Sequence, residues 1–142
     1  MKKQLLITLL ALTTLLSCDT GDSLTDIFLS HPWKLSLFND GGIRTPGNPA
    51  YVLQFYDGAF SVSTRSDATI TGNWQADAKR RTFNCTKVRV NGSIAGDTIA
   101  QKIEKILKEA QYYEGDANYL QIQVQKNRYM QFHNKYERNN GR

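Results

Sequence analysis

The chain has 142 residues, of which 40% are hydrophobic and 22% charged, with a net charge of +5 and two cysteines. This length predicts a single domain, and the ordinary composition excludes collagen-like, low-complexity and wholly disordered proteins. Two cysteines are too few for a disulfide framework or for a four-cysteine zinc site.

Residues 1–17 have the layout of a secretory signal peptide. Lys2 and Lys3 are followed by an uncharged, leucine-rich stretch over residues 5–16. As a helix this stretch would span about 18 Å, which is too short for a hydrocarbon core of about 30 Å. We therefore predict a cleaved export signal rather than a transmembrane helix.

Residues 15–18, with the sequence Leu-Leu-Ser-Cys, resemble a bacterial lipobox. The resemblance implies that the signal is removed before Cys18 and that this cysteine is acylated, which attaches the chain to a membrane. Two or three acyl chains anchor stably, because each buried methylene contributes about 0.8 kcal/mol. We predict a location in the cell envelope, at the outer membrane rather than the inner one, and leave the periplasmic or surface face open. An ordinary signal peptide with an unmodified cysteine near its cleavage site is the alternative.

The chain after the signal divides into three parts. These are the lipidated cysteine with a tether over residues 18–30, a folded domain over residues 31–134 and a basic tail over residues 135–142. Without Lys2 and Lys3, the 18 basic residues become 16 against 13 acidic ones. We find no clustered basic face of the kind that binds nucleic acid, and predict no such partner. The tail is interpreted as solvated, with phospholipid or polyanion binding as the alternative.

Apolar and polar residues alternate along several stretches after residue 32, which is the period of half-buried strands. The apolar side chains of each stretch would face a core and the polar ones water. The core-facing positions are Trp33, Leu35 and Leu37; Tyr51, Leu53 and Phe55; Phe60 and Val62; Ile70, Gly72 and Trp74; Leu120, Ile122 and Val124; and Met130 and Phe132.

Turn residues separate these strands. Asp57 and Gly58 indicate a hairpin turn, because glycine adopts positive φ at little cost, and Lys126 with Asn127 predicts a second tight turn. Residues 39–49 are rich in glycine and proline and are predicted to be a longer loop.

Residues 81–90 break the alternation, because Cys85 and Val88 lie on opposite phases. A β-bulge near residues 86–87 would restore a single buried face and would bend the strand. Bends of this kind allow a sheet to curl and close.

One segment has the period of a helix instead. Thr98 is predicted to be its N-cap, with Gln101 at the third position of a capping box, and charged residues cover the outer face. A shorter helix can form over residues 24–29. The apolar stripe of the longer helix consists of Ile99, Ile103, Ile106, Leu107 and Ala110.

Together these elements predict a mainly β (α+β) fold. We expect a small antiparallel barrel-like or strongly bent sheet of about seven or eight strands. One packed α-helix would precede the C-terminal hairpin.

The order of these elements and the placement of the aromatic residues resemble a META/HslJ-type domain over residues 31–134. The similar features are Trp33-Lys34-Leu35, the strand 51–55, Gly72-Asn73-Trp74, a helix ending near Tyr112-Tyr113, and a hairpin of 119–124 with 129–132. Two cysteine-containing segments of better-known members are missing. The resemblance implies a small barrel-like domain in small bacterial lipoproteins of the Bacteroidetes type, with a loose link to envelope stress and no established catalysis.

Residues that carry enzymatic chemistry are not arranged in a recognisable pattern. The sequence lacks the common hydrolase, phosphate-binding and zinc motifs. His31 and His133 are far apart and are interpreted as structural, and the acidic residues lie mainly in turns. We therefore predict no catalytic residues, no metal, no cofactor and no enzymatic activity.

Cys85 would be left without an intramolecular partner once Cys18 is acylated. Its phase matches that of Phe83, which predicts a buried and inert thiol, with an intermolecular or redox role as the alternative. Five tyrosines fall outside the core phase or at element ends, and their hydroxyls are predicted to contact water. A recognition surface for a protein or a glycan is the alternative. These tyrosines are Tyr56, Tyr112, Tyr113, Tyr119 and Tyr129.

The resulting functional hypothesis is a lipid-anchored, non-catalytic binding module of the cell envelope, for a protein, a glycan or an apolar ligand. The alternative is an inhibitor of a secreted hydrolase of protease or lysozyme type, with residues 39–49 as its contact. An apolar cavity in the fold would favour ligand binding. A filled interior with one rigid protruding loop would favour inhibition.

Overall fold

Strands dominate residues 24–134, the part of the chain that the computed structural model describes. The predicted signal peptide, Cys18 and the basic tail lie outside these residues. Within the described part, no helix is both long and apolar enough to cross a membrane. The elements are η1 (Thr25–Leu29), β1 (Trp33–Asp40), β2 (Ile43–Pro46), β3 (Val52–Phe55), β4 (Ala59–Ser63), β5 (Thr69–Asp77), β6 (Thr82–Asn91), α2 (Thr98–Glu109), β7 (Tyr112–Gly115), β8 (Tyr119–Gln125) and β9 (Arg128–His133).

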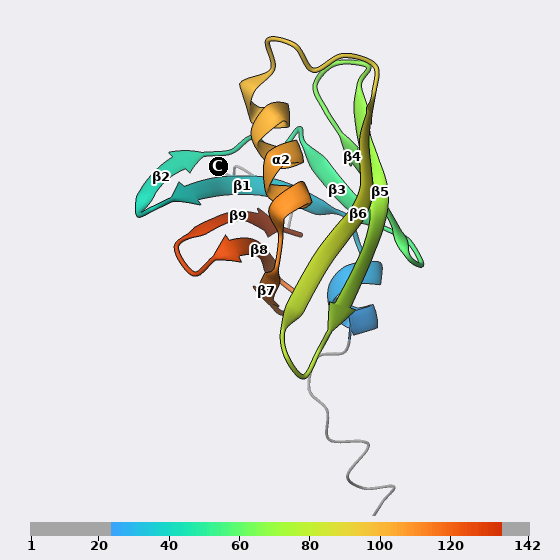
Figure 1. The fold of residues 1–142 in the computed structure, drawn as a ribbon, viewed down its shortest axis with the longest axis vertical. Coiled ribbons are helices and arrows are strands. Elements are labelled where there is room, and N and C mark those ends of the chain that lie inside the picture. Colours follow the sequence, from blue (N-terminus) through green and yellow to red (C-terminus); the bar gives the residue numbers. More distant parts are fainter. Residues whose placement is uncertain (1–23, 135–142) are drawn as a thin grey trace, which may run out of the picture.

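The nine strands form one antiparallel sheet that curls into a ring (Figure 1). Their order is β2-β1-β3-β4-β5-β6-β7-β8-β9, and β1 also pairs with β9, which closes the ring. The prediction of a mainly β fold with one packed α-helix is therefore confirmed, with nine strands in place of the seven or eight expected.

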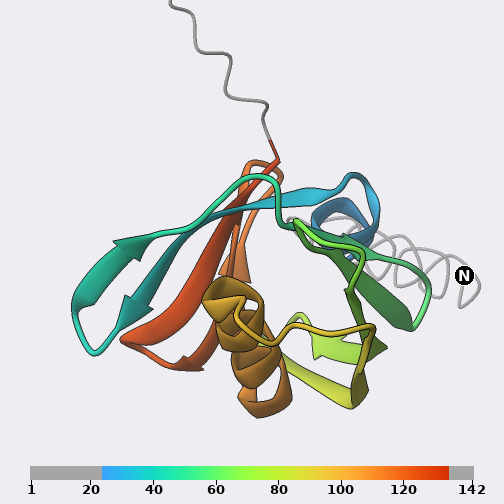
Figure 2. The ribbon, with the colours of Figure 1, turned by 90° about the horizontal axis from the view of Figure 1, so that it is seen from above.

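Two junctions of the ring are much shorter than the others. β1 pairs with β3 only at Trp33 and Lys34, and β6 pairs with β7 only between Thr82 and Tyr112. Helix α2 packs against β6 on one side and against β8 and β9 on the other, as Figure 2 shows. The helix thus lies on the side of the ring where β6 and β7 separate.

Register shifts interrupt three strand pairings, those of β1 with β9, β5 with β6 and β8 with β9, and the first two change which residues are buried. The pairing of β5 with β6 changes register at the predicted place, and Lys87 adopts a positive φ of 54° there, so the predicted bulge is confirmed. A second bulge, between Leu35 and Leu37, was not predicted. It changes the phase of β1, so that Phe38 is buried and Leu37 is only half-buried. The prediction that Leu37 faces the core was wrong for this reason.

Residues 39–49 do not form the predicted loop. They contain the end of β1, a two-residue turn and strand β2, which pairs with β1 from Asp40 opposite Ile43 to Leu37 opposite Pro46. Gly41 and Gly42 have φ of 66° and 97°, the conformation that a tight hairpin turn of this length favours.

The segment after α2 also differs from the prediction, because the helix ends at Glu109. Tyr112 and Tyr113 belong instead to strand β7.

Helix α2 begins one residue earlier than predicted. Asp97, not Thr98, is its N-cap, because the Asp97 carboxylate accepts the Ala100 N–H at 3.0 Å. The same carboxylate also accepts the Tyr51 hydroxyl at 2.8 Å, which holds it in place. Gln101 does not complete a capping box, since its side-chain amide donates to the Ile94 carbonyl at 3.0 Å. Otherwise the predicted stripe is largely confirmed, and Ile103 and Leu107 are fully buried.

The buried apolar side chains form one core cluster, in which Phe28 of η1 lies among four other aromatic rings. Its ring centroid is 4.9 Å from that of Phe55, 4.8 Å from Trp74, 5.6 Å from Phe83 and 5.1 Å from Tyr113. The short helix η1, predicted over residues 24–29, therefore inserts a core residue. Its backbone is also held, because the Trp33 indole N–H donates to the Ile27 carbonyl at 3.0 Å.

Candidate functional site

The titratable residues of the described chain do not form a group that could hold a metal ion. Within residues 24–134, no three His, Cys, Asp or Glu side chains lie together as metal ligands would. His133 precedes Asn134 in the sequence, and His31 contacts the Asn134 side chain. The Nε2 atom of His31 is 3.1 Å from the Asn134 amide nitrogen, and His133 is exposed.

The tyrosines divide into two groups. Tyr113 and Tyr129 are 2% and 7% exposed, so the prediction that they lie outside the core was wrong. Tyr56 and Tyr112 are 52% and 43% exposed, as expected. Tyr119 is half-buried.

Three hydrogen bonds support the turn between β1 and β2, and two of them reach other parts of the chain. The Gly42 N–H donates a hydrogen bond to Asn39 Oδ1 at 2.8 Å, which links the turn to the end of β1. The Asn39 amide nitrogen donates to the Tyr129 hydroxyl at 3.2 Å. The Gly41 N–H donates to the Asn127 carbonyl at 2.9 Å, which joins this turn to the turn between β8 and β9.

We call residues 40–44 and 126–128 the twin-turn tip. Figures 1 and 2 both show its two turns side by side, at the end of the ring from which the β1–β2 hairpin projects. Ile43 is 69% exposed at this tip, more than Leu29, Tyr56 or Tyr112, the other large exposed apolar residues of the described chain. The exposed Arg44 and Lys126 carry positive charges at the tip, and the exposed Asp40 carries a negative one.

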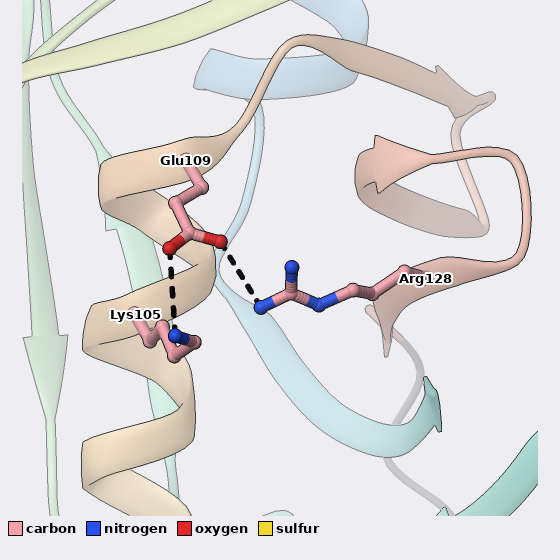
Figure 3. Close-up of polar contacts among 3 residues, drawn as sticks. All are labelled: Lys105, Glu109 and Arg128. Carbon is pink, nitrogen blue, oxygen red and sulfur yellow. Dashed lines mark ion pairs between the residues drawn. The ribbon is translucent and has the colours of Figure 1, made fainter. Parts of the chain in front are cut away.

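The β8–β9 side of the tip is fastened to helix α2. The Arg128 guanidinium lies 3.0 Å from a carboxylate oxygen of Glu109, whose other oxygen is 3.5 Å from the Lys105 ammonium (Figure 3). These pairs are partly exposed, so each contributes at most about 1 kcal/mol to stability. Of the two pairs, only Arg128–Glu109 joins the start of β9 to the helix, because Lys105 and Glu109 both belong to α2.

The outer edge of β2 is poorly suited to pairing with a further strand. The Gly47 N–H donates to the Ser36 carbonyl at 2.8 Å, and bonded pairs alternate along an antiparallel ladder. The backbone polar groups of Arg44 and Pro46 therefore point away from β1, toward the open edge. Pro46 has no N–H to donate there. Contact through side chains, above all Ile43, is thus favoured over strand addition.

Sequence reasoning found part of this site. It selected residues 39–49 as a contact but did not predict their hairpin, although paired glycines between two strand-forming stretches are a recognised turn signal. The link from Asn39 to Tyr129 joins residues 90 positions apart, and no local pattern could have indicated it.

Comparisons with known proteins support the fold. The family described as "Domain of unknown function (DUF4847)" matches residues 46–134. The crystal structure of a DUF4847 family protein from Bacteroides vulgatus is similar, with a TM-score of 0.63 and 23% sequence identity, over 80% of this chain and 98% of that chain. At this identity the similarity supports the fold alone. No curated protein matches the chain.

Proposed function

The chain belongs to the DUF4847 family, whose function is unknown, and we propose that it is a lipid-anchored, non-catalytic interaction module of the cell envelope. The export signal and the lipobox-like residues before Cys18 support the anchor. The outer membrane is the proposed location, on either face.

The proposed contact is the twin-turn tip, and its rigidity carries the proposal. A surface that is already ordered loses less conformational entropy when it binds. Three hydrogen bonds and the Arg128–Glu109 pair hold the tip, while Ile43 projects from it without a cover of its own. An exposed apolar side chain on an ordered support is suited to insertion into a pocket of a partner protein.

We also propose that the domain is META-like, with a sheet that is barrel-like in its closure. The opening strand at Trp33, the single α-helix and the closing pair of β8 and β9 support this proposal. Participation in envelope stress follows from this resemblance alone.

Inhibition of a secreted hydrolase, of protease or lysozyme type, is the second candidate. The observation that favours it is the combination of one packed core cluster with a narrow projecting hairpin, since a two-residue turn can enter a cleft. The positive charge contributed by Arg44 and Lys126 would suit an acidic cleft margin.

Site-specific photocrosslinking in living cells tests the proposed contact. A photoreactive amino acid at position 43 should yield discrete crosslinked species, whereas the same group at Gln54, on the outer face of β3, should not. Ile43→Glu should then reduce copurification of the crosslinked partner by at least about tenfold, because a buried carboxylate is costly.

Two controls complete this experiment. Leu29→Glu alters another exposed apolar residue, which is 40% exposed on η1, and should leave the partner bound. Cys18→Ala should release the chain from the membrane fraction. Identical crosslinks from positions 43 and 54 would contradict the proposal. Inhibition of a purified muramidase or protease by the wild type, and not by Ile43→Glu, would favour the second candidate.

A further inference from the structure

The outer face of β8 and β9 carries a cluster of amide side chains that the twin-turn tip does not include. Gln121 lies opposite Gln131, and Gln123 lies opposite Tyr129. Their neighbours in the sequence, such as Ile122 and Met130, point into the core, so the amides point outward. We call Gln121, Gln123 and Gln131 the amide face.

Hydrogen bonds orient the three amides in one direction. The Gln123 amide nitrogen donates to Gln121 Oε1 at 3.0 Å, and the Gln121 amide nitrogen donates to Gln131 Oε1 at 2.9 Å. The Gln131 amide nitrogen lies 3.5 Å from Nε2 of His133. Each group is thereby fixed by its neighbour, as in a preformed site.

This network leaves hydrogen-bonding capacity at the surface. A primary amide has two donor hydrogens and an acceptor oxygen with two lone pairs. The three glutamines are half-buried, and the contacts above use only part of each amide. The face therefore presents both donors and acceptors, on side chains whose orientation these hydrogen bonds restrain.

The composition of the face indicates which ligand it suits. Its three amides carry no formal charge; of the charged residues next to them, Glu114 on β7 lies directly opposite Gln121, and Lys34 on β1 lies opposite His133. Tyr112, which is 43% exposed, lies beside Gln123 on β7, and Tyr119 lies on β8 beside His133. Neutral amides next to tyrosine rings match a ligand that has many hydroxyls and apolar C–H surfaces but no phosphate or sulfate.

We propose that the amide face binds a neutral glycan. Vicinal hydroxyls can donate to an amide oxygen and accept from an amide N–H at once, and a sugar ring can lie against an exposed tyrosine. A peptide is a poorer match, because β8 is paired on both sides and offers no backbone edge for strand addition. A nucleic acid would require a cluster of cations on the face. The proposal does not depend on the role of the twin-turn tip.

Affinity electrophoresis of the full-length chain in detergent tests this proposal. Gels containing a neutral mannan, glucan or galactan should retard the protein, and at least one of the three should do so strongly. Gln121→Ala and Gln131→Ala should each weaken the apparent affinity by about tenfold, which corresponds to about 1.4 kcal/mol. Gln54→Ala, which removes a half-buried outward amide from β3, is the matched control and should bind normally.

Further outcomes separate this proposal from its competitors. Gln123→Ala, at the other end of the network, should also weaken binding, and each variant is compared with the wild type by thermal unfolding. Ile43→Glu should bind the glycan normally, and Gln131→Ala should keep the crosslinks from position 43. Absence of retardation by all three polysaccharides would overturn the proposal, as would equal loss in the Gln54→Ala control. Binding to dextran sulfate or to a peptide library alone would also overturn it.

Discussion

Asn39 shows how one polar residue can organise a contact surface. It is 9% exposed, and both ends of its side-chain amide are engaged, one by the turn glycine Gly42 and the other by Tyr129. A buried polar group contributes to a unique structure only when its partners are all present. Because its two partners belong to different hairpins, Asn39 links the β1–β2 turn to strand β9.

Cys85 is the free cysteine within residues 24–134, and its environment determines the reactivity of its thiol. Burial raises the pKa of Cys85 from its ordinary value of 9.0 to about 12. Since the thiolate is the reactive form, folded protein at pH 8 should react about a thousandfold more slowly than an exposed cysteine. Intact-mass analysis after a short incubation with iodoacetamide, with peptide mapping to distinguish Cys18, should find Cys85 labelled only in urea. Rapid labelling of the folded protein would contradict this.

The same shift also has a consequence for stability. The unfolded chain loses the Cys85 proton near pH 9, whereas the folded chain keeps it to about pH 12. The contribution of this thiol is therefore fully present below pH 9 and is lost as the pH rises between these two values. The pKa of Tyr51 is raised by burial and by its hydrogen bond to Asp97. Its contribution to stability is therefore also lost as the pH rises.

At the scale of elements, the start of α2 is a sensitive position. Asp97→Ala removes the N-cap and the acceptor of the Tyr51 hydroxyl, so we expect a loss of about 1–3 kcal/mol in the free energy of unfolding. Thr98→Ala should change it by less than about 0.5 kcal/mol, because Thr98 is exposed and does not cap the helix. Urea unfolding followed by circular dichroism measures both. A larger loss in Thr98→Ala would restore Thr98 as the cap.

Elements with a regular alternation could be predicted from the sequence. The strands around Leu53, Val62 and Ile122 alternate cleanly, and their burial follows that alternation. Strands β2, with the sequence Ile-Arg-Thr-Pro, and β7, with Tyr-Tyr-Glu-Gly, do not alternate apolar and polar residues, so no period marks them. The burial of Phe38 depends on a bulge in the pairing with β9, which is a tertiary effect.

The candidate surfaces were less predictable than the elements. The alternation of Gln121 and Gln123 with core residues placed them outside, but their link to Gln131 depends on the register of the closing hairpin. The choice of Asp97 over Thr98 as N-cap likewise depends on Tyr51, which lies 46 positions earlier in the sequence.

At the scale of the whole molecule, η1 is part of the core rather than of a tether. Phe28 is fully buried among aromatic rings from four strands, and a Phe→Ala change at such a site costs about 3–5 kcal/mol. We expect Phe28→Ala to lower the midpoint of urea unfolding strongly. Leu29→Ala, at the next and exposed position, should lower it little. Equal effects of the two changes would show that η1 does not contribute to the core.

The pairing of β1 with β9 has a consequence for the order in which the chain can fold. These strands stand at opposite ends of the described sequence, whereas most other neighbours in the sheet are joined by short connections. Contacts between residues so far apart in the sequence form slowly, because the long loop between them must close first. A chain delivered from its N-terminus can assemble its early hairpins as they emerge, but the ring stays open until β9 arrives. The last few residues of the domain thus decide when its aromatic interior is shielded from water.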